Sequence, residues 1–173
     1  GKTLGIIGLG ELGSAVAKLG QALGMTVLAL RSENGAESAT IPRVSMEELL
    51  GKADFLSLHC PLTEANTGLV DESFLAKMKP SAFLINTARG GLIQTDALLH
   101  ALDQGVIQGA AIDVLTKEPA SPDEPLLARQ KPNLIVTPHN AWGASESRAR
   151  LIDQLCENIG AWQAGSPIRW VNP

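Results

Sequence analysis

The chain has 173 residues, 45% of them hydrophobic, and a formal net charge of −4 at pH 7. This length can bury one substantial core, and the scattered basic residues exclude the clustered positive charge that attracts nucleic acid or an anionic membrane. No apolar run approaches the roughly 20 residues of a membrane span, and the two cysteines lack metal-ligand spacing, so we expect a cytoplasmic single-domain protein without a metal site.

Short apolar runs alternate with helical patterns along the chain. Six nearly continuous runs are typical of strands buried on both faces of a parallel sheet, at residues 4–7, 27–30, 55–58, 83–85, 110–112 and 134–136. Helices are expected at residues 11–23, 45–50, 71–78, 95–105 and 145–163. Residues 115–132 are expected to form a surface loop with one helical turn around Leu126. The pattern predicts an α/β fold, a doubly wound parallel six-stranded sheet of the Rossmann type.

A polar residue or a glycine follows each predicted strand. These residues are Gly8, Arg31, His59, Arg89, Asp113 and His139. The carboxyl ends of parallel strands lie at one edge of a sheet, and ligands of such folds bind there. We therefore expect these residues to meet at one crevice although they are far apart in the sequence.

The segment GLGELG, residues 8–13, lies between the first predicted strand and the first predicted helix. Gly8 permits a tight turn, Gly10 lets the backbone approach a pyrophosphate, and Gly13 lets the helix pack on the strand. The amides of Glu11 and Leu12 would point at the phosphates from the positive end of the helix. The alternative is a bare turn with three glycines, but the strand and helix around it favour a dinucleotide site.

The second predicted strand ends in Arg31 and Ser32, where dinucleotide-binding proteins that use NAD carry an acidic residue for the ribose 2′-hydroxyl. A guanidinium binds a phosphate in a bidentate fashion, so this replacement favours NADP and leaves NAD possible. Glu33 argues against NADP because its carboxylate would repel the 2′-phosphate. The alternative reading of Arg31 is a solvated surface arginine.

Five segments match, in this order, the motifs of one family: GIIGLGELG (5–13), ADFLSLHCPLTEANTGL (53–69), LINTARGGLIQTDAL (84–98), GAAIDVLTKEP (109–119) and TPHNAWGA (137–144). With these segments the chain resembles the D-isomer-specific 2-hydroxyacid dehydrogenases. The resemblance implies a catalytic arginine at Arg89, an acidic partner at Glu118 and an acid/base histidine at His139.

The chemistry of 2-oxo acid reduction suits these three residues. Negative charge grows on the keto oxygen as hydride arrives, and a histidine such as His139 can supply the proton, which is worth roughly 100 to 10,000-fold in rate. Glu118 bonded to the other ring nitrogen would fix the tautomer, and Arg89 would bind the substrate carboxylate and polarise the keto oxygen. The alternatives are a structural histidine, a plain surface glutamate and an arginine that caps a strand end.

The resemblance also implies further contacts to the cofactor. Contacts mainly through backbone groups are implied for Thr87, Ala88, His59, Cys60 and Pro61. Asp113 fits the contact to the nicotinamide carboxamide, and His59 itself reads as structural rather than catalytic. Trp142 resembles the variant of members that reduce hydroxypyruvate and glyoxylate, where it would either wall a small-substrate pocket or pack across a subunit interface.

Members of this family have about twice the length of this chain and two domains. We therefore expect residues 1–173 to be the dinucleotide-binding domain of a longer homodimeric enzyme, lacking its N-terminal substrate domain and inactive by itself. The final helix and tail, residues 145–173, would contact the missing half or a twin subunit. The expected substrate is a small 2-oxo or 2-hydroxy acid; the alternative is a dinucleotide-sensing interaction module, because transcriptional corepressors resemble this family.

Overall fold

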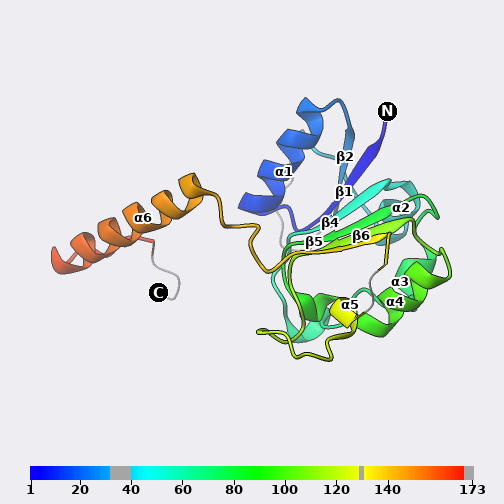
Figure 1. Ribbon diagram of the computed structural model, residues 1–173. Helices are drawn as coiled ribbons and strands as arrows, with labels where there is room; N and C mark the ends of the chain where they lie inside the picture. Colours follow the sequence, from blue (N-terminus) through cyan, green and yellow to red (C-terminus); the bar gives the residue numbers. More distant parts are fainter. Residues whose placement is uncertain (32–39, 129–130, 170–173) are drawn as a thin grey trace. The chain divides into compact units, whose positions relative to one another are not determined.

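The computed structural model describes residues 1–31, 40–128 and 131–169. Within them, seven parallel strands form one sheet in the order β3-β2-β1-β4-β5-β6-β7 (Figure 1). The strands are β1 (Thr3–Ile7), β2 (Thr26–Leu30), β3 (Arg43–Val44), β4 (Phe55–Leu58), β5 (Phe83–Asn86), β6 (Gly109–Ile112) and β7 (Leu134–Val136). The strand order changes direction between β1 and β4, which confirms the doubly wound α/β fold and puts its switch point there.

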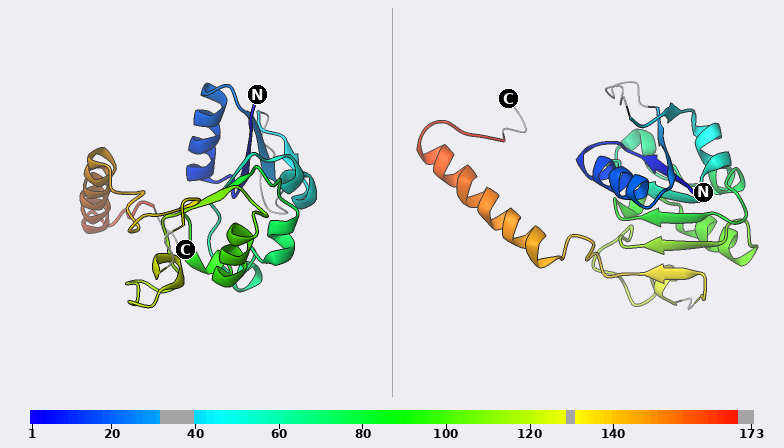
Figure 2. Two further views of the ribbon diagram at one scale, coloured as in Figure 1. Left: turned by 45° about the vertical axis from the view of Figure 1, so that its right-hand side comes forward. Right: turned by 90° about the horizontal axis from the view of Figure 1, so that it is seen from above.

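The predicted number of strands was wrong by one. β3 is a seventh strand, and it pairs with β2 only through Ala29 with Arg43 and Leu30 with Val44. A two-residue strand that begins with an arginine has no apolar run to reveal it. The six longer strands coincide with the six apolar runs, and the arrows of β5, β6 and β7 point the same way in the right-hand view of Figure 2.

Helices follow the strands as the sequence predicts. They are α1 (Glu11–Ala22), α2 (Met46–Lys52), α3 (Glu72–Ala76), α4 (Thr95–Asp103), α5 (Pro125–Ala128) and α6 (Ser145–Gln163), with 3-10 turns η1 (Glu64–Asn66) and η2 (Gly90–Leu92). The side chain of Ser45 caps α2 by accepting a hydrogen bond from the backbone N–H of Glu48 at 3.2 Å. The predicted helical turn around Leu126 is α5.

The sheet is buried on both faces at β1, which contributes alternate side chains to two cores. The expectation that every strand is buried on both faces was wrong for β7, where Ile135 is 64% exposed. Leu4 and Ile6 pack with Ala17 of α1 in one core. Ile7 belongs to the larger core on the other face, which takes side chains from α2, α3 and α4. Figure 1 shows α1 on one side of the sheet and α3 and α4 on the other. This packing holds the strands rigidly, so the loops at their carboxyl ends start from fixed positions.

The chain divides into two compact units, Gly1–His139 and Asn140–Pro173. The second unit contains α6, an unbroken helix of 19 residues (Figure 2). None of these residues is buried. Leu151, Leu155 and Ile159 recur every four residues and therefore share one face of α6. Across the described residues, no helix has both the length and the apolar character that crossing a membrane requires.

Candidate active site

The residues predicted to meet at one crevice all follow strands of one parallel sheet. Gly8, Arg31, His59 and Asp113 come directly after β1, β2, β4 and β6, while Arg89 and His139 follow β5 and β7 by three residues. Because the strands are parallel, all six positions lie at the carboxyl edge of the sheet. The edge also contains the switch point between β1 and β4, where folds of this class bind ligands.

The glycine turn after β1 leaves its centre open. A Cβ on Gly8, whose φ is +97°, would lie 2.5 Å from the backbone nitrogen of Cys60, and one on Gly13 would lie 2.0 Å from the oxygen of Gly8. Close packing therefore requires both glycines. A Cβ on Gly10 would meet nothing within 4 Å, so the space beside the helix N-terminus is open. The first amides of α1 have no partner within the helix and can bind an anion there.

The guanidiniums of Arg31 and Arg43 both lie at the end of β2, where Nη1 of Arg43 donates to the oxygen of Leu30 at 3.4 Å. The backbone N–H of Arg31 donates to the oxygen of Val44 at 2.9 Å, which joins the strand end to β3. Its side chain is exposed, with Nη2 3.5 Å from the oxygen of Arg43. Ser32 and Glu33, which follow Arg31 in the sequence, lie outside the described residues.

The turn after β4 is held by its own side chains. The ring Nε2 of His59 lies 2.9 Å from Oγ of Ser57, and burial lowers the pKa of His59, so this imidazole is neutral at pH 7. Burial also raises the pKa of the Cys60 thiol. Asn66 closes the turn by donating to the oxygen of Pro61 at 2.8 Å and accepting from the N–H of Thr63 at 2.7 Å. Asn66 was not among the residues predicted from the sequence, although Thr63 and Asn66 have capping-box spacing.

A buried asparagine shapes the turn that carries Arg89. Asn86, the last residue of β5, has no solvent exposure. Its side chain accepts from the N–H of Ala88 at 3.0 Å and donates to the oxygen of Arg89 at 2.9 Å. Thr87 and the Arg89 side chain are exposed at this edge. Asn86 was missed in the sequence, where the only signal was a polar residue at the end of a buried strand.

Asp113 is 4% exposed and is held by the neighbouring strand end. The hydroxyl of Thr137 donates to its Oδ1 at 2.5 Å, and the backbone N–H of Asp113 donates to the oxygen of Asn86 at 2.9 Å. Thr137 was also missed in the sequence. It orients the carboxylate that the sequence analysis assigned to the cofactor.

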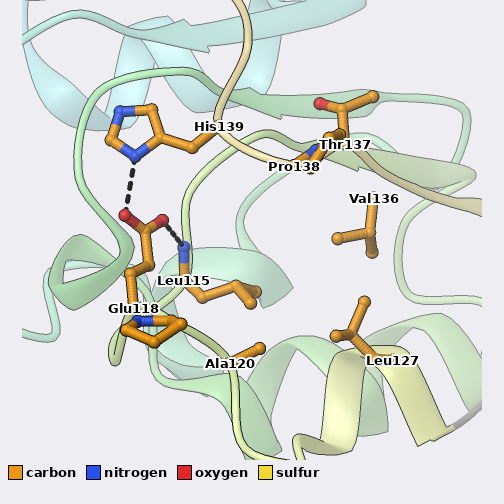
Figure 3. A pocket seen from close by; sticks show the side chains of 9 residues that line it. Leu115, Glu118, Ala120, Leu127, Val136, Thr137, Pro138 and His139 are labelled. Atoms are coloured by element: carbon orange, nitrogen blue, oxygen red, sulfur yellow. Dashed lines mark hydrogen bonds and ion pairs between the residues drawn. The ribbon is translucent and has the colours of Figure 1, made fainter.

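Glu118 and His139 form a pair. Oε2 of Glu118 lies 2.6 Å from Nδ1 of His139, and its Oε1 accepts from the N–H of Leu115 at 2.9 Å (Figure 3). The Leu115 N–H, and next the His139 ring, lower the pKa of Glu118, so the carboxylate is charged at neutral pH. His139 has a φ of +52°, a strained conformation for a residue with a side chain and one that is frequent at functional sites.

A hollow of about 380 Å³ lies beside this pair (Figure 3). The side chains of Leu115, Leu127 and Val136 make its apolar walls. Figure 3 shows Nδ1 of His139 turned toward Glu118 and Nε2 on the opposite side of the ring. The arrangement fits a proton donor whose carboxylate partner fixes the orientation of the ring through one nitrogen.

Comparison with known proteins identifies the family. Residues 1–141 match the family described as D-isomer specific 2-hydroxyacid dehydrogenase, NAD binding domain. The chain belongs to this family. The matched segment includes the glycine turn, Arg89, Glu118 and His139, so the 2-hydroxyacid dehydrogenase motifs and the carboxyl edge of the sheet coincide.

Several relatives of this 2-hydroxyacid dehydrogenase domain are about twice its length. Glycerate dehydrogenase of Methylorubrum extorquens is 46% identical over 96% of this chain and 52% of its own. Hydroxypyruvate reductase of Blautia hydrogenotrophica is 42% identical over 99% of this chain and 53% of its own. A solved acyclic imino acid reductase in complex with NADPH and D-Arg has a TM-score of 0.90 and 36% identity over 99% of this chain and 54% of that one. The chain spans about half the length of the curated relatives it matches.

Most of the residues predicted for the site belong to the first compact unit of this 2-hydroxyacid dehydrogenase domain. Trp142 lies in the second unit, where it is 58% exposed and lines a shallow hollow with Arg148 and Ile152. The glycine turn fits the dinucleotide of this family, because the open side of Gly10 and the first amides of α1 suit a pyrophosphate. Among the described residues, no group of three His, Cys, Asp or Glu side chains could hold a metal ion.

Proposed function

We propose that the whole protein reduces a small 2-oxo acid, either hydroxypyruvate or glyoxylate, with NADP preferred over NAD and His139 as the proton donor. The observation that carries the proposal is the 2.6 Å contact between Glu118 and His139 at the same sheet edge as Arg89. The names of relatives support the substrate class, since one is a hydroxypyruvate reductase.

Each of the three side chains has one role in the proposed reaction. The chemistry that the dinucleotide supplies when bound is a hydride for the keto carbon. Arg89 binds the substrate carboxylate and draws charge toward the keto oxygen, and His139 donates the proton from Nε2 to that oxygen. Glu118 keeps its negative charge and stabilises the imidazolium before the proton leaves.

The exposed guanidinium of Arg31 supports the preference for NADP. A bidentate donor at the end of β2 suits a 2′-phosphate better than a ribose hydroxyl. The structural relative bound to NADPH is consistent with this choice.

The same proposal includes the organisation of the whole protein. Residues 1–173 supply the dinucleotide-binding domain, a further domain supplies the rest of the substrate site, and the protein is a cytoplasmic homodimer. The support for the further domain is the length of these two relatives, about twice that of this chain. The face of α6 that carries Leu151, Leu155 and Ile159 is suited to contact the further domain or a twin subunit.

Replacing the proton donor tests the function. His139→Ala is expected to leave the dissociation constant of NADPH unchanged and to lower kcat by at least about 100-fold, because the keto oxygen loses its acid. Turnover is measured in the whole protein with hydroxypyruvate, glyoxylate and pyruvate, each with NADPH and with NADH. The matched control is His100→Ala, since His100 lies exposed in α4.

Two outcomes contradict the proposal. Unchanged turnover in His139→Ala rules out His139 as the acid. Tight NADPH binding by the unaltered protein without turnover of any 2-oxo acid favours the dinucleotide-sensing interaction module instead.

A further inference from the structure

The segments that carry Arg89 and Glu118 touch through their backbones at Gly90. Gly90, the first residue of η2, is buried. A Cβ on it would lie 2.0 Å from the carbonyl carbon of Leu115, 2.2 Å from the oxygen of Leu115 and 2.4 Å from the nitrogen of Thr116. No side chain fits between the two segments.

Backbone conformation does not explain the glycine at this position. The φ of Gly90 lies outside the left-handed region that Gly8 occupies, so a residue with a side chain could adopt it. The only property of glycine used here is the missing Cβ. Gly90 therefore sets how closely the Arg89 turn approaches the segment at Leu115.

The contact continues on both sides toward the reacting groups. On one side, the side chain of Asn86 donates to the oxygen of Arg89, and the N–H of Ile93 donates to the oxygen of Gly90 at 3.0 Å. These two hydrogen bonds fix the Arg89 turn. On the other side, the N–H of Leu115 donates to Glu118, whose second oxygen contacts His139. The contacts of Gly90, Leu115 and Glu118 therefore connect the Arg89 turn to His139.

We propose that Gly90 is a positioning residue that seats the Arg89 turn on the Leu115 backbone and thereby holds Glu118 against His139. This inference rests on the proposed reductase function. An ordinary contact needs at least 3.4 Å, so a Cβ at Gly90 forces the Leu115 peptide to retreat by about 1.4 Å. A displacement of about 1 Å can cost on the order of 100-fold in rate.

The test compares two adjacent glycines. Gly90→Ala is expected to raise the pKa of Glu118 toward its ordinary value, because the Leu115 N–H and His139 move away, and to lower kcat by on the order of 100-fold. NADPH binding should change little. Gly91→Ala is the matched control, since the three atoms nearest to its Cβ all belong to the side chain of Leu62, which can move. The pKa is measured by carbon-13 NMR titration of the Glu118 carboxyl group in the 173-residue chain, and kcat in the whole protein.

The NMR titration decides the inference without any turnover. An unchanged pKa of Glu118 in Gly90→Ala overturns it, and so does an equal rise in Gly91→Ala. If Gly90→Ala does not fold, Asn86→Ser is titrated instead, because it loosens the Arg89 turn without adding an atom at Gly90. An unchanged pKa of Glu118 in Asn86→Ser also overturns the inference. Absence of turnover in the unaltered protein refutes the reductase function and leaves the titration informative.

Discussion

Arg31 has its guanidinium exposed at the end of β2, next to the backbone of β3. We expect Arg31→Glu to weaken NADPH binding by about 10 to 100-fold, because the variant replaces a charged hydrogen-bond donor with a carboxylate that repels the 2′-phosphate. Binding of NADH should be unchanged or tighter, because a carboxylate accepts from a ribose hydroxyl. Dissociation constants of both cofactors, measured by calorimetry, check this prediction.

Arg148→Glu in α6 is the control for the change in net charge, since Arg148 is also exposed but lies in the second unit. An equal loss of affinity for NADPH and NADH in Arg31→Glu would show that the arginine does not read the 2′-phosphate.

Asp54 ties the start of β1 to the loop before β4. Its Oδ2 accepts from the N–H of Thr3 at 2.8 Å, and Lys79 donates to Oδ1 at 3.2 Å. The Thr3 N–H, with Lys79, lowers the pKa of Asp54. Because the pKa is lower in the folded than in the unfolded state, the carboxylate stabilises the fold above its unfolded pKa of about 3.9, and this contribution is lost as pH falls further.

Asp54→Asn is therefore expected to lower the free energy of unfolding at pH 7 by about 1 kcal/mol, and by less at pH 3. Urea unfolding at the two pH values measures the difference. Asp153→Asn, on exposed α6, should change neither value. A deficit of equal size at both pH values would mean that the charge of Asp54 is not what matters.

Among the secondary-structure elements, those with a strong repeating pattern were predictable. The apolar runs predicted the six longer strands, and the N-cap residue Ser45 predicted the start of α2. β3 was not predictable, because two residues carry no period and their pairing depends on β2 already being in place. Thr137 was not predictable for a similar reason, since its partner Asp113 lies at the end of a neighbouring strand. Asn86 binds Ala88 and Arg89 within its own turn, and a single polar residue at the end of an apolar run does not specify those two bonds.

Apart from Trp142, the described residues of the candidate site belong to the unit Gly1–His139. The glycine turn, Arg31, Asp113 and the Glu118–His139 pair are all fixed by contacts made inside that unit. Residues 1–141 alone are therefore expected to bind NADPH as tightly as residues 1–173. Fluorescence titration of the two chains with NADPH makes the comparison. Weaker binding by the shorter chain would show that Trp142 or another residue of the second unit contributes to NADPH binding.

The two strands at the edges of the sheet are its shortest, with two residues in β3 and three in β7. Pro42 directly precedes β3, and Pro138 follows β7 by two residues. Because these edge strands are short, few of their backbone groups are available to pair with a strand of a neighbouring molecule. The proline near each edge strand lacks a backbone N–H, which removes one more donor. Among the described residues, neither edge strand therefore offers a long template for polymerisation through a shared sheet.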